Sequence, residues 1–575
     1  MTLDHKIAIA QINPTVGDLV GNGIKIIEYI QKARAAGANV VVFPEQVVTG
    51  YPANDLLLHP DFIRDAMYIN EEIAKATHGI TAIVGTIEAT EQGQGPNGKS
   101  LHSTALVMKD GKIIGRQAKT LLPAYDVFHE QRYFTPAHSA DPIYVDGVKY
   151  GIQLCEDMWD KEYERKITKE LVDKGAEIIV NISASPYFVH KKKARYNIIR
   201  EHAQQQKVPF LYVNMVGGQD ELIFDGGSMA ANPDGSLAEQ LPQFEESLNI
   251  VDFCAGKKKS LELMVAEEEV FKGLTLGLRD YIKKNNLKKA VLGLSGGIDS
   301  ALTAVIASEA IGAENIKGLA LPSQFNTNQS HDDAKTLADR LGIEFDTVPI
   351  KGMYDAALKE LSRTFEGKPF DVTEENIQAR LRMMVLMAYT NKHRYTLLST
   401  GDKSEIALGY CTLYGDMSGG ISVISDLTKP EVFALARWYN KMKGREIIPE
   451  STLTKKPSPE LKPGQVAPFD YERMSPLLEM ITSRKSIAEL REMGYSTAEI
   501  REAYSKWKAS EFKRWQAPVA LKCKPVSFGH GRIYPVTNRY VPFDLIEALK
   551  AEQEAEKEKK KRSEEKLEKK VEVAN

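Results

Sequence analysis

Short apolar runs alternate with amphipathic stretches along residues 6–252. Each run has the length of a buried strand, and several intervening stretches, such as 23–36 and 164–174, repeat apolar residues at helical spacing. Strands that alternate with helices are typical of an α/β arrangement. A turn sequence at 232–236 predicts a hairpin near the end of this region. The predicted strands span residues 7–12, 40–43, 82–85, 105–108, 150–154, 178–182 and 211–214.

The second half of the chain shows the same alternation after a charged stretch that is poor in strands. A helix is expected over 270–285, followed by an apolar strand over 290–294 and a glycine turn. A helix from 301 to about 313 and a strand over 316–321 come next. This order of elements predicts a doubly wound parallel sheet.

The chain has 575 residues, which is too many for one hydrophobic core, so at least two domains are expected. Residues 547–570 are almost all charged or favourable to helix, and we expect a helical or disordered tail there. The predicted division is an α/β domain over 1–254, a linker over 255–269, a second α/β domain over 270–540 and the tail over 541–575.

Composition and charge exclude several classes of protein. Hydrophobic residues make up 43% of the chain and charged residues 27%, as in ordinary globular proteins, and no apolar run is long enough to cross a bilayer. A formal net charge of −3 gives no basic surface for nucleic acid. The four cysteines are widely scattered and the N-terminus lacks a signal-peptide pattern. We therefore expect a cytoplasmic protein without a nucleic-acid or membrane partner.

Three reactive side chains of the first domain each stand where a predicted strand ends. They are Glu45, Lys119 and Cys155. The carboxyl ends of strands in an open α/β sheet converge on one crevice, so these residues can meet. A carboxylate base, an ammonium and a thiol nucleophile suffice for acyl transfer. Considered alone, Cys155 could be a buried structural cysteine, and Glu45 and Lys119 could be ordinary surface charges.

The sequences around these residues resemble the nitrilase family of carbon–nitrogen hydrolases. They are Phe43-Pro44-Glu45, Lys119-Thr120-Leu121-Leu122-Pro123 and Cys155-Glu156-Asp157-Met158-Trp159. The resemblance covers about residues 5–252 and implies a four-layer α-β-β-α sandwich. It also implies that Glu45 is the base, Lys119 the stabiliser of the tetrahedral intermediate and Cys155 the nucleophile.

Further residues resemble the glutamine-binding positions of the amidotransferase branch of this family. Tyr125, Ser185 and Lys191 are the candidates, with structural loop residues as the alternative. Glu130 and Glu156 are expected to support the site by holding Lys119 or shaping the surroundings of the thiol.

The glycine turn of the second half has the features of an anion site. Small residues let successive backbone N–H groups turn inward, and the following helix directs its positive N-terminus at the same place. The turn lacks the Lys-Ser/Thr ending of kinase-type phosphate loops and has Asp299-Ser300 instead. The full sequence Ser295-Gly296-Gly297-Ile298-Asp299-Ser300 resembles the loop of ATP pyrophosphatases, which adenylate an oxygen and release pyrophosphate. Ser300 is expected to cap the helix, to contact phosphate, or both.

Downstream sequences resemble motifs of NAD synthetases, and the match covers about residues 265–540. These sequences span residues 375–382, 400–405, 408–416, 457–461 and 512–514. This resemblance implies contacts of Asn376, Glu405 and Lys513 with deamido-NAD, and of Asp299 and Glu405 with Mg²⁺. Many glutamine-using members have Asn where this chain has Asp402. The implied ATP-binding residues are Gly293, Leu294, Ser295, Gly296, Gly297, Ile298, Asp299, Ser300 and Thr400. Arg380 and Arg382 face either the dinucleotide phosphates or solvent.

Both halves together resemble the glutamine-dependent NAD synthetase family. The expected reaction adenylates deamido-NAD with MgATP and amidates it with ammonia that the first domain releases from glutamine through a Cys155 thioester. One alternative is an amidotransferase that acts on a different carboxylate, and another is a nucleotide-binding regulatory protein with an inactive first domain. The expected partners are these small molecules and further copies of the chain in a homo-oligomer.

Overall fold

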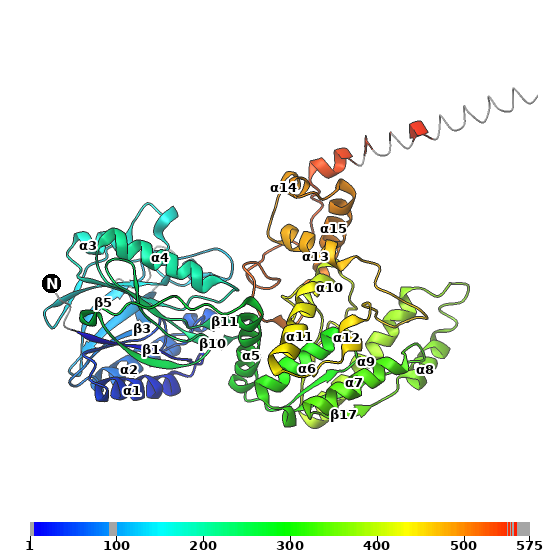
Figure 1. The fold of residues 1–575 in the computed structure, drawn as a ribbon, viewed down its shortest axis with the longest axis horizontal. Helices are drawn as coiled ribbons and strands as arrows, with labels where there is room; N and C mark the ends of the chain where they lie inside the picture. The colour runs from blue at the N-terminus through cyan, green and yellow to red at the C-terminus, as the bar shows by residue number, and fades with distance from the viewer. Residues whose placement is uncertain (1–4, 91–100, 549, 552–553, 555–556, 560–575) are drawn as a thin grey trace, which may run out of the picture.

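The structure is a computed structural model that describes residues 5–90, 101–548, 550–551, 554 and 557–559. The chain forms two lobes side by side, one from its first half and one from its second half (Figure 1). The predicted tail begins within the described residues, since 543–548 are helical, and continues largely outside them.

Two six-stranded sheets form the centre of the first lobe. The first sheet has the order β14 (Ser247–Asp252), β1 (Lys6–Gln11), β2 (Val40–Val42), β3 (Thr81–Ala89), β4 (Leu101–Lys109) and β5 (Lys112–Ala118). The second has the order β13 (Leu237–Gln240), β12 (Met229–Ala231), β9 (Phe210–Asn214), β8 (Ile178–Ser183), β7 (Val148–Leu154) and β6 (Ile143–Val145). The predicted turn at 232–236 joins β12 to β13.

Helices cover the outer face of each sheet, so the first lobe has the four layers that its sequence predicts. The helices are α1 (Leu19–Ala35) and α2 (Pro60–Lys75) on the first sheet, and α3 (Ile167–Asp173) and α4 (Lys191–Gln206) on the second. Alternate strand residues divide between two cores. Ile7 and Ile9 of β1 face the second sheet, whereas Ala8 and Ala10 pack under α1 and α2. This α-β-β-α sandwich confirms the predicted fold.

A six-stranded, all-parallel sheet forms the centre of the second lobe. Its order is β17 (Glu344–Thr347), β16 (Ile316–Ala320), β15 (Ala290–Gly293), β18 (Thr396–Ser399), β19 (Ile421–Ser422) and β20 (Val519–Ala520). Leu292 packs toward α5 (Ala266–Lys284), α6 (Ile298–Ile311), α7 (Asn328–Leu341) and α11 (Lys429–Lys443). Val291 packs on the other side with residues of α8 (Lys351–Leu361) and α9 (Val372–His393). Helices on both faces confirm the doubly wound arrangement.

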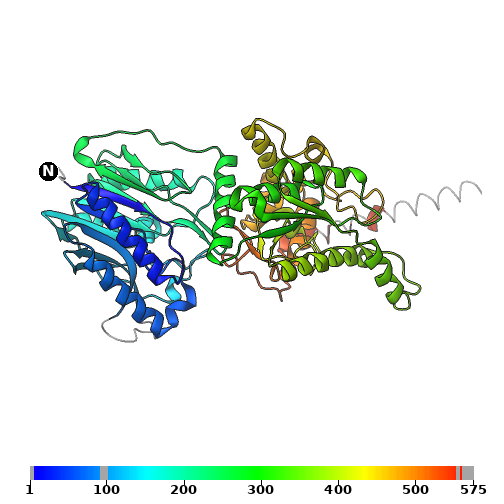
Figure 2. The same cartoon turned by 90° about the horizontal axis from the view of Figure 1, so that it is seen from below.

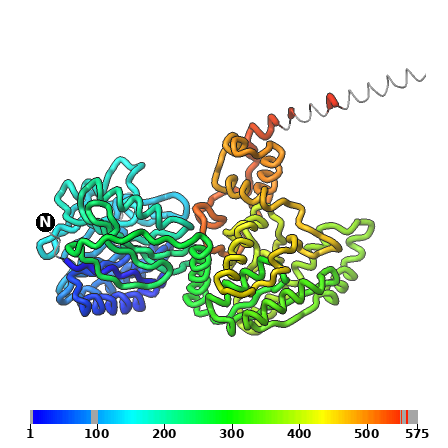
Figure 3. Tube along the Cα trace, viewed as in Figure 1, coloured from blue at the N-terminus to red at the C-terminus, as the bar shows by residue number. Residues whose placement is uncertain are grey.

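Small helices complete the second lobe above the sheet. They are α10 (Lys403–Leu408), α12 (Glu450–Thr454), α13 (Tyr471–Thr482), α14 (Ile487–Glu492), α15 (Thr497–Ala509) and α16 (Glu511–Arg514). Figure 3 shows the chain returning from them, in orange-red, to the side of the first lobe. Short 3₁₀ turns are η1 (Asn54–Leu58), η2 (Glu130–Arg132), η3 (Cys155–Met158), η4 (Asp160–Glu162), η5 (Phe253–Ala255) and η6 (Ala313–Asn315).

Helix α5 stands at the junction of the two lobes (Figures 1 and 2). It begins at Ala266, four residues before the predicted start, and packs on a hairpin of the first lobe formed by β10 (Val216–Gln219) and β11 (Leu222–Asp225). Ile223 of this hairpin shares one hydrophobic core with Leu274 and Leu278 of α5. The apolar core is therefore continuous from one lobe to the other.

Candidate active sites

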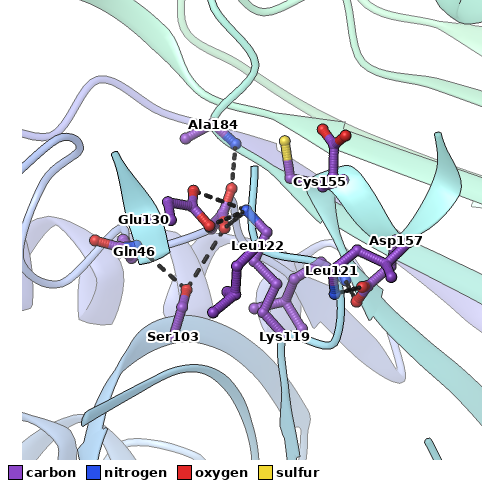
Figure 4. Close-up of polar contacts among 12 residues, drawn as sticks. Gln46, Ser103, Lys119, Leu121, Leu122, Glu130, Cys155, Asp157 and Ala184 are labelled. Carbon is purple, nitrogen blue, oxygen red and sulfur yellow. Dashed lines mark hydrogen bonds and ion pairs between the residues drawn. The ribbon is translucent and has the colours of Figure 1, made fainter. Parts of the chain in front are cut away.

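The three reactive residues of the first lobe lie at strand ends of two facing sheets. Glu45 follows β2, Lys119 directly follows β5, and Cys155 directly follows β7. All three side chains are at least 96% buried. The ammonium of Lys119 lies 2.9 Å from Glu45 Oε1 and 2.8 Å from the carboxylate of Glu130. Figure 4 shows the side chains of Lys119, Glu130 and Cys155 within this cluster. Residues that are 36 to 110 positions apart in sequence thus form one polar cluster, as the strand-end argument predicts.

The charges of this cluster favour a neutral thiol and a charged lysine. Burial opposes the charged form of Lys119, but Glu130 and Glu45 outweigh this effect and raise its pKa well above the usual value. Burial and the nearby Glu45 carboxylate raise the pKa of the Cys155 thiol. Burial also raises the pKa of Glu130 to about 7. Cys155 therefore requires a base at the moment of attack, and the cluster supplies carboxylates for that purpose.

Asp157 ties the loop of the nucleophile to the loop of Lys119. Its carboxylate accepts hydrogen bonds from the backbone N–H groups of Leu154 (3.0 Å), Leu121 (2.7 Å) and Thr120 (3.1 Å). Cys155 itself has φ +42°, a left-handed conformation that is uncommon outside glycine. Since such strain persists only where surroundings enforce it, Asp157 is one of the groups that hold the thiol in place.

The predicted glutamine-binding residues lie around the same thiol. The Tyr125 hydroxyl donates to Glu156 Oε2 at 2.9 Å, and the Tyr163 hydroxyl donates to Glu156 Oε1 at 2.9 Å. Both Tyr125 and Lys191 lie near enough to Cys155 for its thiolate form to raise their pKa. Of the two supporting glutamates, Glu130 binds Lys119, whereas Glu156 binds the two tyrosines and acts on the thiol by helping to raise the pKa of Cys155.

Ser185 and Lys191 lie in the segment that leads from β8 into α4. Lys191 Nζ donates to the carbonyl of Pro186 at 2.9 Å and lies 4.9 Å from the ring centre of Phe188. Burial lowers the pKa of Lys191 to about 7. Ser185 is 98% buried and receives hydrogen bonds from Arg195 at its carbonyl (2.8 Å) and hydroxyl (3.3 Å). A carboxylate (Glu156) and an ammonium (Lys191) thus stand at the nucleophile, as an amino acid's two charged ends require.

A second site is a cavity of about 440 Å³ above the carboxyl ends of the strands in the second lobe. Its walls include every residue predicted for ATP, deamido-NAD or metal except Gly296. They are Gly293, Leu294, Ser295, Gly297, Ile298, Asp299, Ser300, Asn376, Thr400, Glu405 and Lys513. Helix α6 begins at Ile298, within the motif rather than at 301, with Gly297 as its N-cap. Ser300 is therefore not the cap and lies in the first turn, where its hydroxyl donates to the Gly297 carbonyl at 3.0 Å.

Gly296 lies where the glycine turn approaches the backbone of α7. It has φ +74°, and a Cβ added there would lie 2.0 Å from the carbonyl oxygen of Ser330. The Thr452 hydroxyl donates to the Gly296 carbonyl at 3.3 Å. A side chain at this position would displace α7 from the turn, so glycine is required although the residue does not line the cavity.

Three carboxylates gather beside the glycine turn. Ligand oxygens of Asp299, Asp402 and Glu405 lie within 4.8 Å of one another. Lys429 Nζ lies among them, at 2.7 Å, 2.9 Å and 2.8 Å respectively. Burial raises the pKa of Asp402 to about 6 and that of Glu405 to about 8, against the lowering effect of Lys429. Hard divalent cations prefer such oxygen donors, so these residues fit Mg²⁺.

The sequence identifies Asp402 only as a departure from the Asn of many family members, and it gives no sign that Lys429 belongs to this cluster. The position of Asp402, at the end of a strand and the start of a helix, was the available signal. Its carboxylate also caps α10 by accepting from the Glu405 backbone N–H at 2.9 Å. The two arginines, for which the sequence allowed either the dinucleotide phosphates or solvent, differ in position. Arg382 lines the cavity and donates to the Leu321 carbonyl. Arg380 is exposed and donates to the Leu413 carbonyl.

Two predicted dinucleotide residues are fixed by neighbouring loops. Lys513 Nζ donates to the carbonyls of Gly409 (2.8 Å) and Cys411 (2.6 Å), and Asn376 Oδ1 accepts from the Thr412 hydroxyl at 2.7 Å. These contacts place both side chains at the wall formed by residues 409–412.

Each half of the chain matches a known protein family. Residues 6–257 match the carbon-nitrogen hydrolase family and residues 270–517 match the NAD synthase family. A glutamine-dependent NAD(+) synthetase of Synechocystis is 40% identical over 93% of this chain and 99% of its own length. The corresponding protein of Thermotoga maritima is 38% identical over 93% of this chain and 99% of its length.

Solved structures show the same arrangement. The glutamine-dependent NAD+ synthetase of Acinetobacter baumannii, in complex with adenosine diphosphate, is 34% identical, with a TM-score of 0.74 over 93% of this chain and 98% of that chain. A Cytophaga hutchinsonii structure, at 22% identity and a TM-score of 0.80, covers 94% of this chain and 99% of its own and shares the fold. None of the helices in the described residues has the length and apolar character needed to cross a membrane.

Proposed function

Because the chain belongs to the family of glutamine-dependent NAD(+) synthetases, a group of carbon–nitrogen ligases that take the amide nitrogen from glutamine, we propose a division of labour between its two sites. The cluster around Cys155 hydrolyses glutamine to glutamate and ammonia. The cavity of the second lobe joins that ammonia to deamido-NAD at the expense of ATP. This pairing accounts for both sites. The alternative of a regulatory protein with an inactive first lobe does not explain why Glu45, Lys119 and Glu130 form an ordered cluster.

In the first lobe, Glu45 accepts the proton of Cys155 as Sγ attacks the carboxamide carbon of glutamine. The Lys119 ammonium stabilises the oxyanion of the tetrahedral intermediate. The C–N bond then breaks, the nitrogen takes up the proton from Glu45, and ammonia leaves a thioester on Cys155. Water, activated by the same carboxylate, hydrolyses the thioester to glutamate and restores the thiol. Glu130 keeps Lys119 charged and directed at the site throughout.

Charge complementarity assigns the two ends of glutamine. Glu156, whose carboxylate oxygens are oriented by two tyrosine hydroxyls, binds the α-ammonium group. Lys191, with Ser185 beside it, binds the α-carboxylate. An approaching carboxylate stabilises the ammonium form of Lys191, which burial otherwise disfavours.

In the second lobe, the nicotinate carboxylate of deamido-NAD attacks the α-phosphorus of ATP, and pyrophosphate leaves. Ammonia then attacks the activated acyl carbon, AMP leaves, and the amide of NAD remains. The glycine turn and the N-terminus of α6 bind the pyrophosphate portion, and Lys429 adds a positive charge nearby. Asp299, Asp402 and Glu405 would hold Mg²⁺, which when bound supplies neutralisation of phosphate charge. Asn376 and Lys513 contact deamido-NAD from the 409–412 wall.

The observation that carries this proposal is the ion pair of Lys119 with Glu45 beside Cys155, because it places base, stabiliser and nucleophile in one buried cluster. Replacing Cys155 by Ala tests it directly. We expect glutamine-driven NAD formation to be lost while ammonium-driven formation persists. Persistence of both activities would exclude Cys155 as the nucleophile.

Homo-oligomer formation, a cytoplasmic location and the domain boundaries at 254, 269 and 540 remain predictions from the sequence.

A further inference from the structure

A row of buried polar groups connects the first turn of α5, in the second lobe, with the candidate glutamine site in the first. It begins at Glu269, which is 97% buried although it lies at the end of the predicted linker. Glu269 Oε1 accepts from Gln243 Nε2 at 3.3 Å, and the same amide donates to Asp225 Oδ2 at 3.0 Å. Glu269 Oε2 accepts from the backbone N–H of His190 at 3.1 Å.

The row continues from Asp225 to Ser185. Asp225 Oδ1 pairs with Arg195 Nη1 at 2.6 Å, and both side chains are completely buried. Arg195 Nη2 then donates to the carbonyl of Ser185 at 2.8 Å and to its hydroxyl at 3.3 Å. A buried guanidinium adopts the orientation that its carboxylate partner imposes, so the position of Ser185 depends on how Asp225 is held.

Glu269 acts on both ends of the loop that carries the carboxylate-binding residues. Through Gln243, Asp225 and Arg195 it fixes Ser185 at the start of this loop. Through the His190 N–H it fixes the residue directly before Lys191. His190 has φ +69°, a left-handed conformation that turns the chain into α4. One side chain of the second lobe is thus connected by hydrogen bonds to both ends of the segment between Ser185 and Lys191.

We propose that Glu269 is a positioning residue for glutamine binding, acting through Gln243, Asp225 and Arg195 on the Ser185–Lys191 loop. This inference rests on the assignment of Ser185 and Lys191 to the α-carboxylate of glutamine under the proposed function. It means that the glutamine site is completed by the synthetase lobe. Since α5 packs on α6, which begins in the glycine turn, the same helix touches elements of both sites.

The substitution Glu269→Gln isolates this role because it keeps size and shape. Glu269 offers two acceptor oxygens to two donors, the Gln243 amide and the His190 N–H. A glutamine at 269 has one oxygen and one NH₂ group, so one donor must face another donor. The matched control is Glu268→Gln in the same helical turn, because Glu268 is 35% exposed and pairs with Lys272 at 2.7 Å on the outer side. Both variants lose one negative charge from the same helix N-terminus.

Kinetics of the full-length chain measure the effect. For Glu269→Gln we expect the KM for glutamine to rise about tenfold, because the loss of roughly one hydrogen bond to a charged group weakens binding by about that factor. The kcat of ammonium-driven synthesis should be unchanged. Gln243→Met removes the relay without touching α5 and should raise the KM to a similar degree. Glu268→Gln should behave as wild type. A KM for glutamine in both relay variants equal to that of Glu268→Gln would overturn the proposal.

Labelling of Cys155 separates this inference from the proposed function. Iodoacetamide, which has no amino-acid end, should alkylate the wild type and Glu269→Gln at equal rates. A diazoketone analogue of glutamine should saturate the wild type at lower concentration than Glu269→Gln. Equal saturation in the two proteins would overturn the positioning role alone. Failure of the analogue to label Cys155 in the wild type would overturn the assignment of the glutamine site itself.

Discussion

Lys522 of the second lobe holds its ammonium 3.3 Å from the carboxylate of Asp126 in the first. Asp126 directly follows Tyr125, whose hydroxyl binds Glu156 next to Cys155. Lys522 is 97% buried and also donates to the carbonyls of Lys524 and Pro525. The segment around Lys522 thus contacts the loop beside the nucleophile.

Removing the charge of Asp126 tests this contact. Asp126 has φ +50°, which Asn tolerates well, so Asp126→Asn keeps the backbone and removes the ion pair. We expect the KM for glutamine to rise about threefold, in line with an ion pair in which one partner is still partly exposed, while ammonium-driven synthesis is unchanged. Asp146→Asn is the control, since Asp146 has φ +48° in a hairpin of the first lobe. Equal KM values for the two variants would show that the contact is incidental.

The titration of Lys191 predicts a pH dependence of glutamine use. Burial lowers its pKa to about 7, so in the free enzyme the ammonium exists below that pH and is lost above it. The value of kcat/KM for glutamine should therefore fall as the pH rises through 7. Lys191→Arg keeps the charge at all these pH values, and its profile should lack this fall. A fall at the same pH in both proteins would assign it to another group.

Asp402→Asn tests the carboxylate cluster. Asn is an equally good helix cap, so the cap of α10 is retained while the cluster loses one charge. We expect the Mg²⁺ concentration for half-maximal ammonium-driven synthesis to rise about tenfold, as one charged ligand is replaced by a neutral one. Asp371→Asn makes the same change at the exposed cap of α9 and should leave the Mg²⁺ requirement as it is. An unchanged Mg²⁺ requirement in Asp402→Asn would show that Asp402 is not a ligand of the metal.

Gly296→Ala separates steric conflict from backbone strain. Gly296 and Gly342 both have φ +74°, but a Cβ at 342 has no heavy atom within 4 Å, whereas at 296 it meets the Ser330 carbonyl. Each substitution should lower stability by about 1 kcal/mol through strain, measured by denaturant unfolding. Only Gly296→Ala should also lose ATP-dependent synthesis, with glutamine hydrolysis retained. Equal synthesis rates in the two variants would contradict the steric requirement at the turn.

The local part of both sites could be predicted from the sequence, because strand ends and a glycine turn are themselves local patterns. Glu45, Lys119 and Cys155 follow apolar strands, and parallel strands bring their carboxyl ends together. The motif at 295–300 likewise marks its own strand, turn and helix. The exact start of α6 was missed because the motif's last residues belong to the helix as well as to the loop.

Contacts between distant elements could not be predicted in this way. Lys429 lies 130 residues from Asp299, and no periodicity near Lys429 indicates that its ammonium enters a carboxylate cluster. Glu269 was counted in a charged linker because Glu267 and Glu268 precede it; only the packing of α5 buries one of the three. The surroundings of such residues depend on tertiary packing, and local sequence patterns do not reveal it.

The core that α5 shares with the β10–β11 hairpin makes the two lobes a single cooperative unit. Separating them would expose apolar side chains of this shared core, such as Ile223, to water, at a cost of roughly 2 kcal/mol for each fully buried side chain. Neither lobe can therefore melt without weakening the other, and heat should unfold the molecule in one calorimetric transition. A fragment cut at the junction would expose this apolar core, so we expect it to aggregate even if its active-site residues are intact.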